Sequence, residues 1–205
     1  GGLVLDRTLF RPARIDVGRP PFDEAPEWPY NVIPDALMLN GHLIGLALSS
    51  ADSSAVSARL VPPLDGVSVD ASALVPTNKP CTAWDEDWLP PRVIETSPGQ
   101  WRIELQGGFP RRCEARASLQ LLDRNVITER QVRAVWASLG GRFTAAPGNV
   151  REGALPAGAQ RIAQHSARPW GEVLRNMNKT SDNALTRLLF LQLGVPAMTT
   201  NPEAT

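Results

Sequence analysis

The residues best suited to chemistry lie in one polar turn near the end of the chain. Asn178-Lys179-Thr180-Ser181-Asp182-Asn183 separates two apolar stretches and contains the pattern Ser-x-Asn. A serine hydroxyl and an asparagine amide held close together can relay a proton and orient a polar substrate. Ser and Asp also cap helices, because their side-chain oxygens accept from free amide groups. Short motifs recur by chance, so the pattern alone favours the capping interpretation.

Two predicted helices flank this turn. Pro169 is typical of a first helical turn, and Leu174 and Met177 follow it on one face. Residues 184–193 are apolar on most sides and stop at Gly194. A helix of this kind is expected to be buried between other elements.

A third helix and a strand are predicted upstream. Thr128-Glu129-Arg130-Gln131 has the spacing of a capping box, so we expect a helix to begin there. The apolar residues that follow at helical spacing, before the stop at Gly140, are Val132, Val135, Trp136 and Leu139. A strand is predicted near Gln160–Ser166.

The first half of the chain is predicted to be β-rich. Most of the 19 prolines lie at or before Pro110, and proline disrupts helix interiors. Apolar and polar residues alternate in three stretches, around residues 67–73, 101–105 and 115–121, which is typical of half-buried strands. Asn40-Gly41 lies between apolar residues and predicts a hairpin over Leu37–Ile44.

Composition excludes several classes of partner. Lys+Arg and Asp+Glu both number 21, so the formal net charge is +0, and nucleic acid or an anionic membrane is not an expected partner. No apolar run approaches the roughly 20 residues that a membrane span needs, so no transmembrane segment is expected. With two histidines and no Cys/His cluster, we expect neither a metal nor a cofactor. The cysteines, Cys81 and Cys113, form a disulfide in an oxidising compartment or remain thiols in a reducing one.

Three passages together resemble the D-alanyl-D-alanine carboxypeptidase/endopeptidase family, the class C penicillin-binding proteins. The first is Leu3-Val4-Leu5-Asp6-Arg7-Thr8-Leu9-Phe10, the second is Ala25-Pro26-Glu27-Trp28-Pro29-Tyr30, and the third runs from His165 through Ser181-Asp182-Asn183 to Phe190. The resemblance covers residues 1–31 and 107–195. It implies a bacterial envelope protein, periplasmic or otherwise, that acts on peptidoglycan stem peptides and is acylated by β-lactams. In that setting a Cys81–Cys113 bridge is plausible.

The resemblance also implies an α+β fold. We expect β-rich inserted domains joined to a partial β-lactamase/transpeptidase-like catalytic domain. Residues 1–24 and 107–158 would form part of one inserted domain, and 25–106 a small β domain nested within it. Residues 159–205 would begin the returning catalytic segment that carries Ser-Asp-Asn.

Two of the three active-site motifs of such serine enzymes are missing from these residues. The only lysines are Lys79 and Lys179, and the residues three positions before them are Pro76 and Asn176, so there is no Ser-x-x-Lys. Lys-Thr-Gly is also absent. Because the chain also starts without Met, we expect an inactive internal fragment of an active serine peptidase.

The resemblance assigns roles to three residues. Ser181 would relay a proton to the leaving group, and Asn183 would hold the substrate amide. Asp6 matches an acidic residue that faces the peptide stem, although an ordinary strand-end aspartate fits the position equally well. Two other classes stay open: a non-catalytic envelope binding module, and a hydrolase such as a β-lactamase, against which the large β-rich inserts argue.

Overall fold

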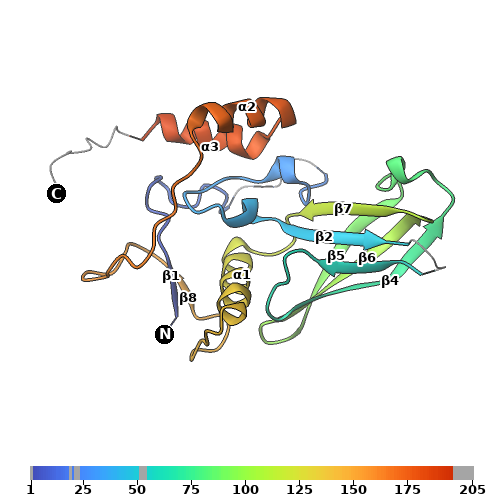
Figure 1. The fold of residues 1–205 in the computed structure, drawn as a ribbon, viewed down its shortest axis with the longest axis horizontal. Coiled ribbons are helices and arrows are strands. Elements are labelled where there is room, and N and C mark those ends of the chain that lie inside the picture. Colours follow the sequence, from blue (N-terminus) through green and yellow to red (C-terminus); the bar gives the residue numbers. More distant parts are fainter. Residues whose placement is uncertain (1, 19, 21–23, 51–54, 196–205) are drawn as a thin grey trace.

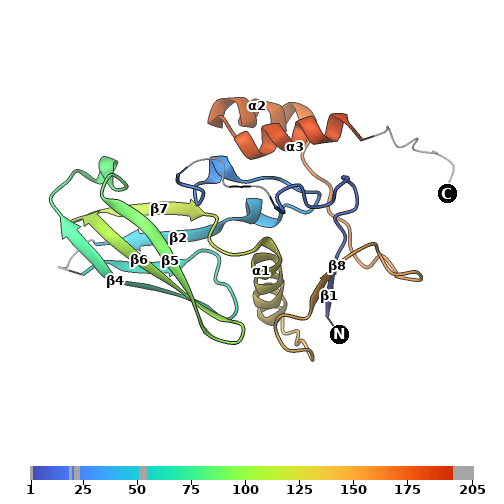
Figure 2. The ribbon, with the colours of Figure 1, turned by 180° about the vertical axis from the view of Figure 1, so that it is seen from behind.

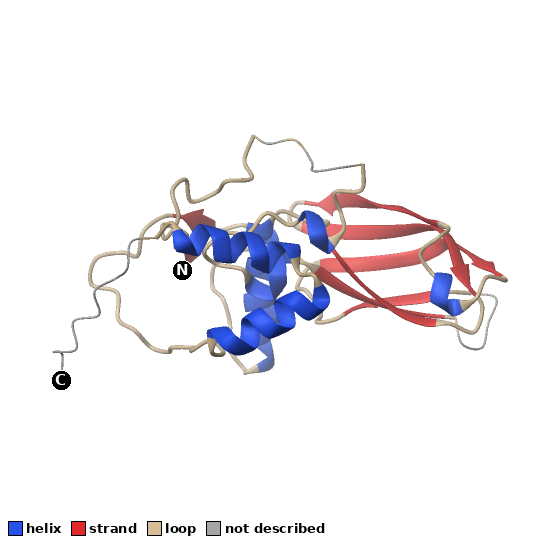
Figure 3. Cartoon of the chain, turned by 90° about the horizontal axis from the view of Figure 1, so that it is seen from above, coloured by secondary structure: helices blue, strands red, loops and turns tan. Residues whose placement is uncertain are grey.

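The computed structural model describes residues 2–18, 20, 24–50 and 55–195. Helix and sheet are both present, and the molecule is elongated, with the long strands gathered at one end and the helices at the other (Figures 1 and 3). This agrees with the predicted mixture of α and β structure at the level of class.

Two three-stranded sheets form the β-rich end (Figure 2). The first has the order β3-β2-β7 and is antiparallel throughout; its strands are Ser57–Leu60, Ile44–Ser49 and Glu114–Leu119. The second has the order β4-β6-β5, with β4 parallel and β5 antiparallel to β6; its strands are Val67–Thr77, Gln100–Pro110 and Trp88–Ser97. Three predicted alternating stretches are confirmed as β4, β6 and β7.

Alternation explains the core between these sheets. Leu46 and Leu48 of β2 and Ile103 and Leu105 of β6 are buried, while the residues between them are only partly buried. A period of two puts every second side chain on the same face, so each strand contributes one apolar face to a shared core. Residues 24–43 form a connector that precedes β2. Trp28 of this connector packs at a tilt on Trp84, with ring centroids 6.4 Å apart, and so anchors the connector to the β-rich end.

A disulfide joins Cys81 to Cys113. Cys81 begins the short 3-10 helix η3 (Cys81–Ala83) between β4 and β5, and Cys113 lies between β6 and β7. The structure therefore selects the bridged alternative of the two that the sequence left open.

The predicted hairpin over Leu37–Ile44 is wrong. Asn40 and Gly41 do have positive φ, at 50° and 63°, as a tight turn requires. However, they form a kink within the short segment η2 (Leu39–His42), and β2 begins only at Ile44. β2 is already paired on both edges, with β3 and β7, so no edge remains for residues 37–39.

Helix α1 (Arg124–Ser138) begins four residues before the predicted capping box. Asp123 is the cap, because its side chain accepts from the amide of Asn125, and Thr128 lies inside the helix. The predicted apolar face is also wrong, since Val135, Trp136 and Leu139 are exposed. The face that is buried is largely polar.

Contacts with distant segments explain why a polar face of α1 is buried, such as the hydrogen bond that Glu129 accepts from the amide of Gly148. Arg130 makes another such contact. Its guanidinium donates to the carbonyl of Gly99 at 2.8 Å, in the tight turn between β5 and β6. A Cβ on Gly66 or Gly99 would lie 3.0 Å from a nitrogen of this guanidinium, and both glycines have positive φ. Glycine is therefore favoured twice at this contact, which joins α1 to the β-rich end.

After α1 the chain runs back to its N-terminal segment. β1 (Leu3–Leu5) pairs in parallel with β8 (Val150–Glu152). The strand predicted near Gln160–Ser166 is absent: these residues are exposed and have no strand partner among the described residues.

Helices α2 (Trp170–Thr180) and α3 (Asn183–Leu193) follow, as predicted. The expected burial of α3 is not found, since Phe190 and Leu193 are each 77% exposed. The domain boundaries stay a prediction; the one proposed after residue 106 falls inside β6, which continues to Pro110.

The disulfide gives a first prediction. The Cys81→Ser/Cys113→Ser variant is expected to lose about 3–4 kcal/mol of unfolding free energy, because the bridge closes a loop with a sequence separation of 32. Denaturant unfolding of variant and parent measures this. As a control, intact mass with and without reductant verifies that the parent is bridged. If the parent is bridged and the variant unfolds at the same denaturant midpoint, the prediction is contradicted.

Candidate functional site

The Ser-Asp-Asn turn joins the end of α2 directly to the start of α3. Ser181 adopts the left-handed conformation, with φ 52° and ψ 44°, and ends α2. Asp182 then donates its backbone N–H to the carbonyl of Met177 at 3.1 Å. A left-handed conformation is unfavourable for a residue with a Cβ, and such residues concentrate at functional sites.

Asp182 performs the capping role that the sequence also allowed for its neighbours. Its Oδ1 accepts from the amide of Leu185 at 2.8 Å. Ser181 and Asn183 are exposed, and the part of the chain described here contains no hydrogen-bond partner for either side chain. Their hydroxyl and amide groups are therefore available to a ligand.

A groove of about 500 Å³ lies beside this turn. Residues 180–185 line one part of it. The rest is lined by residues far away in the sequence, namely Pro29, Tyr30, Val32, Met38, Gly41 and Leu43. The fold thus places the Ser-Asp-Asn turn against the connector that precedes β2.

Arg187 holds the two sides of the groove together. From α3 its guanidinium donates to the carbonyl of Tyr30 at 2.9 Å and to that of Val32 at 3.1 Å. Both acceptors belong to, or directly follow, the short 3-10 helix η1 (Pro29–Asn31). Charge-assisted bonds to two carbonyls fix the position of α3 more strongly than neutral ones would.

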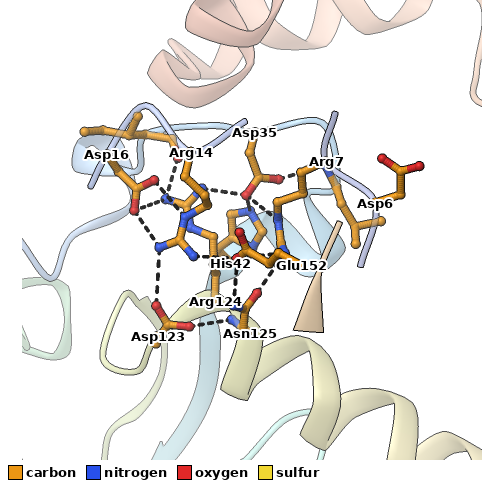
Figure 4. Close-up of polar contacts among 12 residues, drawn as sticks. Asp6, Arg7, Arg14, Asp16, Asp35, His42, Asp123, Arg124, Asn125 and Glu152 are labelled. Atoms are coloured by element: carbon orange, nitrogen blue, oxygen red, sulfur yellow. Dashed lines mark hydrogen bonds and ion pairs between the residues drawn. The ribbon is translucent and has the colours of Figure 1, made fainter. Parts of the chain in front are cut away.

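A buried carboxylate fixes the connector in turn. Asp35 Oδ2 accepts from Arg7 at 2.8 Å and from Arg124 at 2.6 Å, and Oδ1 accepts from the amide of Leu37 at 2.7 Å (Figure 4). His42 Nε2 lies 3.3 Å from Oδ2. Burial alone would raise the pKa of Asp35, but contacts with His42 and Arg124 outweigh it and hold the pKa well below its usual range.

Further ion pairs extend this cluster toward β8 (Figure 4). Arg14 contacts Glu152 at 2.8 Å and Asp16 at 2.9 Å, and Asp16 contacts Arg124 at 2.9 Å. Burial raises the pKa of Glu152, yet hydrogen bonds from Asn125 and Arg14 lower it overall. The cluster joins residues 7–16, the connector, α1 and β8, which lie far apart in the sequence.

Comparison with known proteins identifies the chain. A family model of the D-Ala-D-Ala carboxypeptidase 3 (S13) family matches residues 1–204. This chain belongs to the S13 D-Ala-D-Ala carboxypeptidase family. The family expectation drawn from the three sequence passages is therefore confirmed.

A solved structure shows a similar fold. The chain is similar to penicillin-binding protein 4 (dacB) from Haemophilus influenzae, with TM-score 0.58 and 19% identity over 95% of this chain and 42% of that one, so it spans less than half of that protein. A second structure, of the same protein complexed with a novel beta-lactam, matches with TM-score 0.46 and 16% identity over 76% of this chain and 34% of the other. A search of curated proteins finds no match.

Asp6, the third residue singled out by the S13 resemblance, lies at the end of β1 and is exposed. Its Oδ1 accepts from the hydroxyl and amide of Thr8 at 2.6 Å and 2.9 Å, and its Oδ2 accepts from the amide of Leu155 at 3.0 Å. The Thr8 hydroxyl, more than the two amides, lowers its pKa. Asp6 does not line the groove beside Ser181, so its role toward a peptide stem stays a prediction.

The structure adds site residues that the sequence did not indicate. Arg187 and Asp35 position the groove, and Met38 lines it, but their partners lie too far along the chain for any local spacing to reveal them. Within the described ranges no group of three or more His, Cys, Asp or Glu side chains could hold a metal ion. No helix among the described residues is long and apolar enough to span a membrane.

The stability of three variants tests whether Asp182 alone caps α3 while Ser181 and Asn183 are free to contact a ligand. Asp182→Ala is expected to cost about 1 kcal/mol of unfolding free energy, because it removes the cap of α3. Ser181→Ala and Asn183→Ala are expected to change it by less than about 0.5 kcal/mol, since neither side chain is engaged. Thermal unfolding of all three variants measures this, and a large loss from Ser181→Ala would return that residue to a structural role.

The buried cluster predicts a dependence of stability on pH. Because the pKa of Asp35 is lower in the folded state, its contribution is fully present above the unfolded pKa of about 3.9 and is lost as the pH falls below it. Asp35→Asn should cost about 3–5 kcal/mol at neutral pH, because two arginines lose their buried partner. Urea unfolding between pH 3 and 7 measures both effects. Asp85→Asn, at an exposed position, is the control, and equal losses from both variants would contradict the prediction.

Proposed function

We propose that these residues are part of a serine-type D-Ala-D-Ala carboxypeptidase/endopeptidase that acts on peptidoglycan stem peptides. One observation supports the site assignment above the others. Asp182 caps α3, while Ser181 and Asn183 are exposed beside a groove with no partner among the described residues. Membership of the S13 family supplies the reaction class.

In the proposed reaction a serine oxygen attacks the carbonyl carbon of the D-Ala-D-Ala bond and forms an acyl-enzyme. Ser181 relays a proton to the amine of the departing D-alanine, and Asn183 holds the substrate amide. Water then hydrolyses the ester. A β-lactam would enter by the same attack, and its ring-opened product would stay bound as the ester.

We further infer that the nucleophile, its base and the carboxylate anchor lie outside residues 1–205, because this sequence contains neither Ser-x-x-Lys nor Lys-Thr-Gly. The 205 residues alone would then be inactive. The proposed setting is the bacterial cell envelope, including the periplasm, where cross-linked peptidoglycan is found. We keep the proposed division into inserted portions 1–24 and 107–158, a nested β domain 25–106 and a catalytic segment 159–205.

Penicillin labelling tests this function. The complete polypeptide encoded by the gene is treated with benzylpenicillin, and intact mass is followed over time. One added penicilloyl group is expected, on a serine outside residues 1–205. Ser181→Ala should slow its formation at least about 100-fold, the usual size of a lost proton relay. Asn183→Ala should also slow it, because the amide of the substrate loses its hydrogen-bond partner.

The matched control is Ser166→Ala, at an exposed serine outside the helices and strands. It should be labelled at the parental rate. A folded complete polypeptide that forms no adduct would overturn the proposal and favour the non-catalytic envelope-binding module.

A further inference from the structure

The groove beside Ser181 and Asn183 has an unusual chemical asymmetry. Its side across from the turn is formed by Pro29, Tyr30, Val32, Met38 and Leu43, together with Gly41. None of these side chains carries a charge at neutral pH. The only carboxylate among the lining residues is Asp182, whose Oδ1 is occupied by the amide of Leu185.

This uncharged wall is built into the fold. Val32 is completely buried, and its carbonyl accepts from Arg187, so the wall is held directly to α3. Farther along the connector, Asp35 is held by Arg7 and Arg124 inside the ion cluster. Met38 lies between these fixed points and η2, and its side chain is partly buried.

A wall of this kind discriminates by charge. Burial of an apolar group in the groove is favourable, whereas a carboxylate there loses hydration and meets no cation among the residues that line the groove. Arg187 bonds the wall through the main-chain carbonyls of Tyr30 and Val32, and it is not one of the residues that line the groove. A ligand held by Ser181 and Asn183 would place whatever extends toward residues 29–43 against this surface.

We propose that the wall of Tyr30, Met38 and Leu43 is a specificity-determining surface that accepts the uncharged, apolar portion of the acyl donor. The inference rests on the proposed function, because it takes Ser181 and Asn183 as the groups that hold that donor. It adds the chemical class of the portion that lies beyond them.

Two penicillins that differ by one carboxylate provide the test. Benzylpenicillin carries an apolar phenylacetyl group, and carbenicillin carries the same group with a carboxylate on its α carbon. With the complete polypeptide, benzylpenicillin should acylate about tenfold faster than carbenicillin at equal concentration. Met38→Lys should reduce this preference about fivefold or more, because the new ammonium group favours the carboxylate.

Leu39→Lys is the matched control. It adds the same charge at the next residue, which is exposed and does not line the groove, and it should leave the preference unchanged. Met38→Leu should keep the parental preference and shows whether position 38 tolerates substitution. Thermal unfolding of each variant verifies that it is folded.

The outcomes separate the two proposals. If neither penicillin acylates the parent, the proposed function fails. If both acylate the parent but Met38→Lys and Leu39→Lys leave the same ratio of rates, the function stands and the specificity wall is overturned. If Met38→Lys does not fold, Tyr30→Lys replaces it, because Tyr30 also lines the groove and is already partly exposed.

Discussion

The arrangement of this molecule depends on one carboxylate that is removed from water. Asp35 is contacted by the guanidinium groups of Arg7, just after the first strand, and Arg124 of α1, and its side chain has no exposed surface. Burying three charges is costly, and only close, multiply bonded geometry repays the loss of hydration. Segments that meet in this way cannot slide past one another without leaving a charge unpaired. The connector before β2 therefore has a defined course despite its lack of long helices or strands.

The groove depends on that course. Its two sides come from the connector and from the α2–α3 turn, which are separated by most of the chain, and Arg187 bonds them through main-chain carbonyls. Within the turn, adjacent residues have different tasks. Asp182 satisfies the free amide of α3, and this leaves its neighbours unengaged. The ambiguity of a Ser-Asp-Asn sequence is thus resolved by geometry, since only one of the three side chains points back to the helix.

Local sequence patterns correctly predicted the features that depend on interactions between residues close in the chain. The strands with alternating side chains, the end of α3 at Gly194 and the starts of α2 and α3 agree with the sequence, because each follows from periodicity or capping. The failures share a different cause. α1 buries polar residues because several of them bond to distant segments, as Arg130 does to a carbonyl of the β5–β6 turn, and residues 37–39 form no strand because β2 is already paired on both edges. For the site, Ser181 and Asn183 could be named in advance, but not the groove opposite them, since its lining depends on contacts across the whole chain.

The contact of Arg130 bears on how relatives of this chain can diverge. Its partner in the β5–β6 turn is a main-chain carbonyl, and the space for its guanidinium exists because Gly66 and Gly99 have no side chains. Nearly every side chain of the two sheets could be replaced without altering the contact between Arg130 and this turn. The surface of the β-rich end can then change while this contact is kept, and the packing of Ile127 and Trp28 against the same core helps to hold its orientation. Low sequence identity across this region is compatible with a preserved placement of the whole unit.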